Sequence, residues 1–299
     1  MNKLFFCLVL ICTFENRAFS QSPDSVRYID SLMAKRKTGL LPGSVPTHYT
    51  PGYRSWALQV QQEFEQAAAY YRKYYHREFH LKLAVLDSTQ WIKERIRFGY
   101  LAYEDGWAYI PAQLDYNFFL HVYGLEQQRP QLEALLKKHQ LSHQQMMHSL
   151  FLLFALHELG HYFILDLNGC ETPDNFADEL IATYFSYNYL QSIHSTNAKN
   201  TLIFSKFFTS TYRPEYRRIE DMDTLFSHMS IQNFKWFHCN ILLLCKQIYP
   251  TSGREFISNY LKIFAKGTKT NYGTAELIAL LDKEEKGTIK KWADNLPLH

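Results

Sequence analysis

Residues 149–167 read SLFLLFALHELGHYFILDL. The first eight of them, 149–156, have the length and composition of a buried helix. If that helix continues, its 3.6-residue repeat places His157 and His161 about 40° apart on one face, with Glu158 on the adjoining flank. Burying three polar side chains in so apolar a run is costly unless they have a partner. We therefore expect a core helix whose two histidines bind the same metal ion.

The spacing within residues 157–161, HELGH, is that of an H-E-x-x-H sequence. Two imidazoles on one helix face can reach a single zinc ion at about 2.0–2.1 Å. Glu158 then lies beside a water molecule held by the ion. The ion lowers the pKa of this water to about 7, and Glu158 can accept its proton. Gly160 costs about 1 kcal/mol in a helix interior, so we expect another backbone to approach closely there. The alternative interpretation is a core helix without a metal, in which both histidines are hydrogen-bonded to protein groups and the glutamate forms an ion pair.

Acidic residues follow in the segment 171–179, ETPDNFADE. A hydrolytic zinc site needs a third protein ligand and an open position. A helix that begins near residue 173 places Asp174 and Asp178 four residues apart on one face. Asp174 is the first candidate for the third ligand, with Glu179 and then Glu171 as alternatives, although an acid in a first helical turn is also favoured by the helix dipole. Asp178 is the candidate acceptor for the free N–H of a ligand histidine.

The pattern HELGH, a short connection and an acid-x-x-Ala-Asp helix resembles the gluzincin branch of the zincin metallopeptidases, over residues 157–182. The sequence departs from that pattern in having Asp at position 174 and a shorter gap after His161. Glu179 fits the longer gap of the well-known gluzincins, although Thr183 then stands where they have Asp. The resemblance implies a zincin-like fold, Zn²⁺ as cofactor, and these roles: His157, His161 and Asp174 as zinc ligands, Glu158 as general base, and Asp178 as the carboxylate that orients a ligand histidine.

In the segments before the motif, the spacing of apolar residues changes from a helical to a strand-like repeat. Apolar residues recur at helical spacing over 55–75, residues 79–85 alternate, and 98–112 resemble two short strands around a turn at 104–106. The sequence thus predicts an α+β fold, a small N-terminal antiparallel sheet followed by a mainly helical part. Helices are predicted at about 25–34, 127–138, 142–166, 173–193, 219–248, 252–266, 273–283 and 286–294.

Two further parts of a peptidase site follow from the resemblance. In zincins the edge strand of a small sheet binds an extended peptide through main-chain hydrogen bonds. Residues 100–103 or 107–110 are the candidates for that edge. A transition-state oxyanion also needs a hydrogen-bond donor. The candidate donors in the C-terminal half, among which the sequence does not choose, are Tyr212, Tyr216, His228 and His238.

The N-terminus has the features of a signal peptide. Lys3 precedes an apolar run over 4–14, and small residues flank a cleavage position after Ser20. The apolar stretch 150–167 does not favour a membrane span because polar and charged residues interrupt it, so we expect no stable membrane anchor after the leader is removed. The prediction is a secreted or periplasmic protein with a signal peptide at 1–20, a lead-in segment at 21–50 and a single domain at 51–299.

Composition sets the remaining limits. The chain has 299 residues, of which 46% are hydrophobic, enough for a well-buried core. A net charge of +3 gives no electrostatic reason to expect a nucleic-acid partner. Beyond the leader the cysteines are Cys170, Cys239 and Cys245, so at most one intramolecular disulfide can form. The sequence predicts an exported zinc metallopeptidase acting on peptides or proteins. The alternatives are a metal-binding regulatory module and a zinc hydrolase of non-peptide amides or esters.

Overall fold

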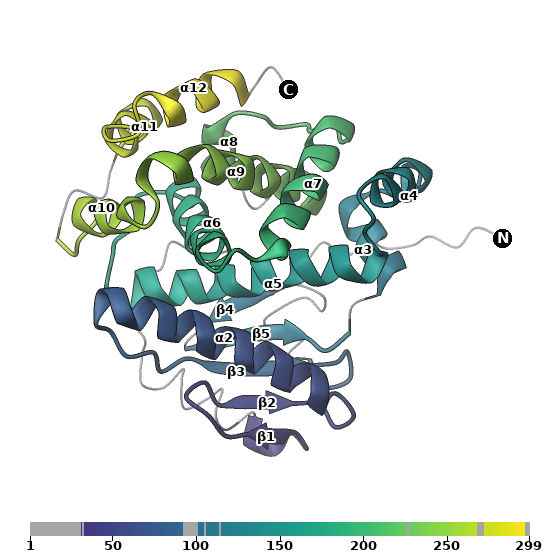
Figure 1. Ribbon diagram of the computed structural model, residues 1–299. Coiled ribbons are helices and arrows are strands. Elements are labelled where there is room, and N and C mark those ends of the chain that lie inside the picture. The colour runs from purple at the N-terminus through teal and green to yellow at the C-terminus, as the bar shows by residue number, and fades with distance from the viewer. Residues whose placement is uncertain are drawn as a thin grey trace.

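The computed structural model describes residues 31, 33–91, 101–104, 106–113, 115–225, 228–267 and 272–296. The predicted signal peptide lies outside the described residues. The chain has an α+β fold, in which a five-stranded sheet lies on one side of helix α5 and most of the other helices lie on the opposite side (Figure 1). The strands are β1 (Gly39–Leu41), β2 (Thr47–Tyr49), β3 (Lys82–Leu86), β4 (Ala102–Glu104) and β5 (Trp107–Pro111).

The sheet is mixed, so the prediction of an antiparallel sheet is wrong in part. Its strand order is β1-β2-β3-β5-β4. The outer pairs β1–β2 and β4–β5 are antiparallel, whereas β2–β3 and β3–β5 are parallel. Helix α2 (Arg54–Tyr75) connects β2 to β3, and such a crossover brings the next strand back in the same direction. The predicted hairpin over 98–112 corresponds to the antiparallel pair β4–β5.

The helical part agrees with most of the predicted segments, with three differences. The segment 219–248 is two helices, because Ser230 caps a new helix by accepting a hydrogen bond from the backbone N–H of Asn233. Helices α3 and α7 were not predicted. The helices are α3 (Tyr116–Tyr123), α4 (Arg129–Lys138), α5 (His143–His161), α6 (Asn175–Ser192), α7 (Thr196–Thr211), α8 (Ile219–Thr224), α9 (Ile231–Ser252), α10 (Glu255–Ile263), α11 (Thr274–Leu281) and α12 (Thr288–Asn295), and a π-helical turn, η1 (Tyr162–Leu167), continues α5.

Helix α5 is the central element of the molecule. It begins with a capping box between Ser142 and Gln145, and it is buried on nearly all sides in its second half. By length and composition alone, α5 with η1 is long enough to cross a membrane, but 78% of its apolar window is buried by the rest of the chain, as in a core helix. The cysteines Cys170, Cys239 and Cys245 are buried and free.

Gly160 confirms the expected close approach of two backbones. A Cβ atom built on Gly160 would lie 2.9 Å from both the Cα and the carbonyl oxygen of Ala182 and 3.2 Å from the Cβ of Phe185. Both neighbours belong to α6, the helix that packs most extensively against α5. The glycine therefore sets the distance between the helices that carry the HELGH and acidic segments.

Replacing Gly160 with alanine is expected to lower the free energy of unfolding by about 1–3 kcal/mol, since the added methyl group meets backbone atoms that cannot yield. This is the net effect of a larger steric cost and of the gain of about 1 kcal/mol that alanine brings to a helix interior. Urea denaturation measures the difference, with Gly273→Ala as the matched control because no atom lies within 4 Å of a Cβ there. Equal or greater stability of Gly160→Ala would contradict the packing described.

Candidate metal centre

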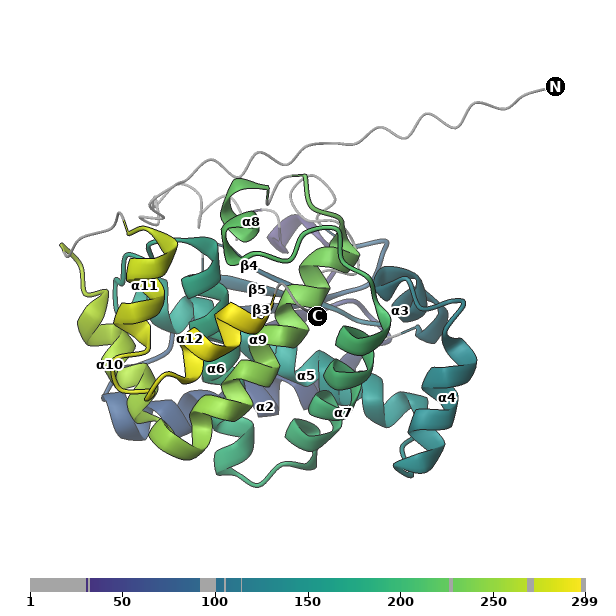
Figure 2. The ribbon, with the colours of Figure 1, turned by 90° about the horizontal axis from the view of Figure 1, so that it is seen from above.

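The chemical groups of the HELGH motif meet side chains from two other helices. His157 and His161 lie in the last turns of α5, Asp178 and Glu179 in the first turns of α6, and His238 in the middle of α9. Helix α6 packs against both α5 and α9, near the centre of the molecule (Figure 2). The site is therefore built on packed helices rather than on loops.

The two motif histidines face each other through one nitrogen each. Their Nε2 atoms are 2.9 Å apart. The Nδ1 atom of His161 lies 3.3 Å from Asp178 Oδ1, and a carboxylate only accepts hydrogen bonds, so Nδ1 carries the proton. The Nδ1 atom of His157 lies 3.1 Å from Thr183 Oγ1. A neutral His161 therefore presents the lone pair of its Nε2 atom to His157, and this contact is favourable with a proton or a cation between the two nitrogens.

Glu179 completes the convergence of ligand atoms. Its Oε2 atom lies 3.0 Å from His157 Nε2, 3.1 Å from His238 Nε2 and 4.0 Å from His161 Nε2. All three atoms, this oxygen and both ring nitrogens of His238, are buried, and despite the short distances none makes a hydrogen bond of regular geometry among the described residues. The ligand atoms of His157, Glu179 and His238 all lie within 4.8 Å of one another. Imidazole nitrogens and a carboxylate oxygen are ligands that zinc accepts, so this set fits the ion that the motif implies.

Asp174, the first candidate for the third ligand, is not part of this convergence. Its side chain caps α6 by accepting a hydrogen bond of 2.7 Å from the backbone N–H of Ala177. The group of possible ligands His157, Glu179 and His238 contains neither Asp174 nor Glu171. His161 is also outside this group, and its Nε2 atom reaches Glu179 Oε2 only at 4.0 Å. The prediction assumed a helix start near residue 173, whereas α6 begins at Asn175, so the acid at 174 became the cap. Asp174 thus serves as a helix cap, and Glu179, one of the alternatives that the sequence offers, is the acid that lies beside His157.

The surroundings of the motif shift the pKa values of its groups. Burial, reinforced by the neighbouring His161, lowers the pKa of His157 to about 3, so this ring is neutral at ordinary pH. Burial opposes protonation of His161 as well, but Asp178 and Glu179 outweigh it and raise the pKa of His161 to about 10. Burial raises the pKa of Glu158 to about 7. A base is most effective when its pKa lies near the working pH, so Glu158 has the properties of a general base.

Of the candidate oxyanion donors, the structure brings His238 to the site. His238 is buried, and its ring centroid lies 5.5 Å from that of His157. Tyr212 instead contacts Ser230, with 3.5 Å between their side-chain oxygens. The remaining two lie elsewhere: His228 is exposed, and the hydroxyl of Tyr216 interacts with Glu215. No local pattern marks His238, because it is 77 residues beyond His161 in the chain.

The sheet offers one of the two candidate edges. Strand β5, which contains residues 107–110, lies between β3 and β4 and is not an edge. Strand β4 is the outermost of the described strands on this side and lies against α5 (Figure 1). The Tyr103 ring of β4 contacts the Tyr162 ring of η1 at 5.8 Å between centroids. Residues 101–103 are therefore the described part of the candidate substrate strand, and Tyr100 lies outside the described residues.

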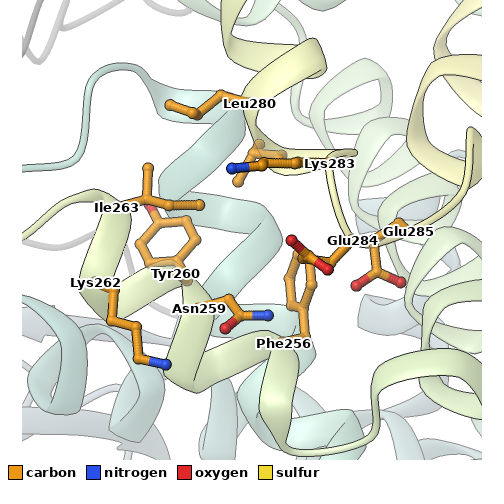
Figure 3. Close-up of a pocket in the computed structure, with 10 residues that line it drawn as sticks. Phe256, Asn259, Tyr260, Lys262, Ile263, Leu280, Lys283, Glu284 and Glu285 are labelled. Atoms are coloured by element: carbon orange, nitrogen blue, oxygen red, sulfur yellow. The ribbon is translucent and has the colours of Figure 1, made fainter.

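A separate pocket of about 150 Å³ lies between α10 and the segment from α11 to α12 (Figure 3). The side chains of Phe256, Tyr260 and Leu280 form part of its wall, and Lys283 and Glu285 contribute charged groups. None of the clustered histidines, His157, His161 and His238, lines this pocket. This pocket therefore does not belong to the candidate metal centre.

The cap residue Asp174 predicts a pH dependence of stability. Burial, together with the nearby Asp223, raises the pKa of Asp174 from 3.8 to about 7. The folded protein thus keeps a proton that the unfolded chain releases, and stability falls as the pH rises from about 4 to about 7. Asparagine caps a helix equally well without the charge. Asp174→Asn is expected to be more stable than the wild type by about 1–3 kcal/mol at pH 7.5, with the difference vanishing near pH 4.

Urea denaturation at pH 4, 6 and 7.5 measures this effect. Asp174→Ala is the control, because it removes the cap and should cost about 1 kcal/mol relative to Asp174→Asn at every pH. A stability difference between Asp174→Asn and the wild type that does not change with pH would exclude a raised pKa at this position.

Comparison with known proteins gives no family, since no protein-family model and no curated protein matches this sequence. The function is therefore inferred from the residues of the site.

Proposed function

We propose that the protein is an exported, zinc-dependent metallopeptidase of gluzincin type. The observation that carries this proposal is the convergence of both motif histidines with Glu179, beside the partly exposed Glu158. His157, His161 and Glu179 would hold the ion. A zinc ion bound by these residues supplies a Lewis acid for a carbonyl group and lowers the pKa of water.

The protein's own groups account for the proton transfers. Glu158 removes a proton from the attacking water and delivers it to the nitrogen of the leaving amine. Asp178 and Thr183 hold the rings of His161 and His157 through their Nδ1 atoms, and so keep both Nε2 atoms directed into the site. His238 donates a hydrogen bond to the oxyanion that develops on the attacked carbonyl. The outer edge of β4 provides main-chain groups that bind an extended peptide.

One observation favours a second candidate function. His238 approaches Glu179 as closely as His157 does, so the cluster offers four ligand atoms. Four protein ligands close the coordination shell of zinc and are typical of structural sites. In that case the protein would be a metal-stabilised binding module, and Glu158 would have no catalytic task.

Digestion of a peptide mixture by the zinc-loaded protein, compared with Glu158→Gln, tests the proposed function. Parallel assays with simple esters and non-peptide amides detect a hydrolase of another specificity, because the same chemistry acts on any polarised carbonyl. No cleavage of peptides, esters or amides would favour the binding module.

A further inference from the structure

A lysine that the sequence motifs do not mark lies beside the candidate centre. Lys235 is on α9, one turn before His238, on the same face of the helix. Its Nζ atom lies 4.7 Å from the ring centroid of Phe154 on α5. Phe154 precedes Glu158 by four residues, so the two side chains share a face of α5 and are about 6 Å apart along its axis. The ammonium group thus lies beside the face of α5 that carries the base, and the two charges interact electrostatically.

The charge of Lys235 is not neutralised by a direct ion pair. Its interactions are with the Phe154 ring and, electrostatically, with Glu158 and Glu179, and among the described residues no carboxylate lies within 4 Å of its Nζ atom. The side chain is only partly exposed. An ammonium group held in a partly buried position with an aromatic ring and no direct counter-ion is free to receive an anion from solution.

The spacing relates this cation to a bound peptide. An extended chain rises about 3.3 Å per residue, so the offset of about 6 Å along α5 between Phe154 and Glu158 spans one or two residues of a bound peptide. We propose that Lys235 binds a carboxylate of the substrate at that distance, either the α-carboxylate of the peptide's C-terminus or the side chain of an Asp or Glu. This inference rests on the proposed function and narrows its substrate class to peptides with a carboxylate near the scissile bond.

A purely structural role for Lys235 makes a different prediction. If the lysine only balances the charges of Glu158 and Glu179, its removal changes the cleavage of all substrates by the same factor. If it binds a substrate carboxylate, its removal affects only the substrates that carry one.

The test uses quenched fluorescent peptides randomised around the scissile bond, in matched forms. One form ends in a free carboxylate and one in an amide, and a third is amidated but carries Asp in place of Asn near its end. For the wild type we expect kcat/KM to be about 10- to 100-fold higher with the appropriate carboxylate, mainly through KM. The first pair detects an α-carboxylate site, and the Asp/Asn pair detects a side-chain site.

Three variants complete the test. Lys235→Met should lose the preference and Lys235→Arg should keep most of it. Lys246→Met is the matched control, since Lys246 is an exposed lysine of the same helix. A wild type without any carboxylate preference, or a preference that persists in Lys235→Met, would overturn the inference.

Binding separates this inference from the proposed function. Fluorescence anisotropy with the same peptides, in a Glu158→Gln background that does not consume them, measures affinity without cleavage. Tighter binding of the carboxylate forms that requires Lys235, in a protein whose wild type cleaves no peptide, would support the carboxylate site and reject the peptidase. Cleavage of peptides with no such difference in affinity or KM would support the peptidase and reject the carboxylate site.

Discussion

Glu158→Gln is expected to lower kcat for peptide cleavage by about 10²–10⁴-fold while leaving bound zinc unchanged. Glutamine has nearly the same shape as glutamate, but its amide cannot take up the proton that the attacking water releases. The pKa of Glu158, raised by burial to about 7, suits that transfer at neutral pH. In the proposed site His157, His161 and Glu179 hold the ion and Glu158 does not, so zinc should stay in place. Peptide digestion and elemental analysis of the same samples measure both quantities.

Glu63→Gln is the matched control for this substitution. Glu63 is also a partly buried glutamate whose pKa is raised by burial, but it lies on α2 and not in the histidine cluster. It should leave both cleavage and zinc content at the level of the wild type. Cleavage that survives in Glu158→Gln would remove Glu158 as the base, and loss of zinc would make it a ligand.

The second large effect concerns zinc affinity. Glu179→Gln is expected to weaken zinc binding by more than about 100-fold, because the loss of a ligand exceeds the 10- to 100-fold typical of the groups that orient ligands. Asp174→Asn should bind zinc as the wild type does, since its side chain caps α6. Competition with a chromophoric chelator measures the two affinities. The opposite ranking would restore Asp174 as the third ligand.

His238→Ala separates the two candidate functions in the same titration. If His238 is the oxyanion donor, zinc affinity is retained and kcat falls by about 10²–10³-fold. If His238 is a fourth ligand, zinc affinity falls with that of Glu179→Gln. The second result would contradict the proposed peptidase and favour a closed structural site.

The sequence predicts well what depends on local geometry. The helical repeat places His157 and His161 on one face, and the structure finds their Nε2 atoms 2.9 Å apart. The glycine at 160 indicates a close backbone, and the backbone of Ala182 is there. Both inferences need only the geometry of one helix and the free-energy cost of placing glycine in its interior.

The parts that the sequence leaves open or mispredicts depend on a helix boundary or on contacts between distant segments. A helix that starts near residue 173 places Asp174 on the same face as Asp178. In the structure α6 begins at Asn175, so Asp174 caps the helix instead. His238 and Lys235 reach the site only because α9 packs against α6. The parallel pair β2–β3 likewise follows from the crossover of α2, which no strand sequence shows by itself.

The most direct test of the proposed function is the return of activity with zinc. Protein stripped with a chelator and dialysed is titrated with zinc while peptide cleavage is followed. We expect no cleavage in the stripped protein, and a linear rise that ends at about one equivalent of zinc, as a single three-ligand site requires. Cleavage that persists without the metal, or a fully zinc-loaded protein that cleaves no peptide, would contradict the proposed function.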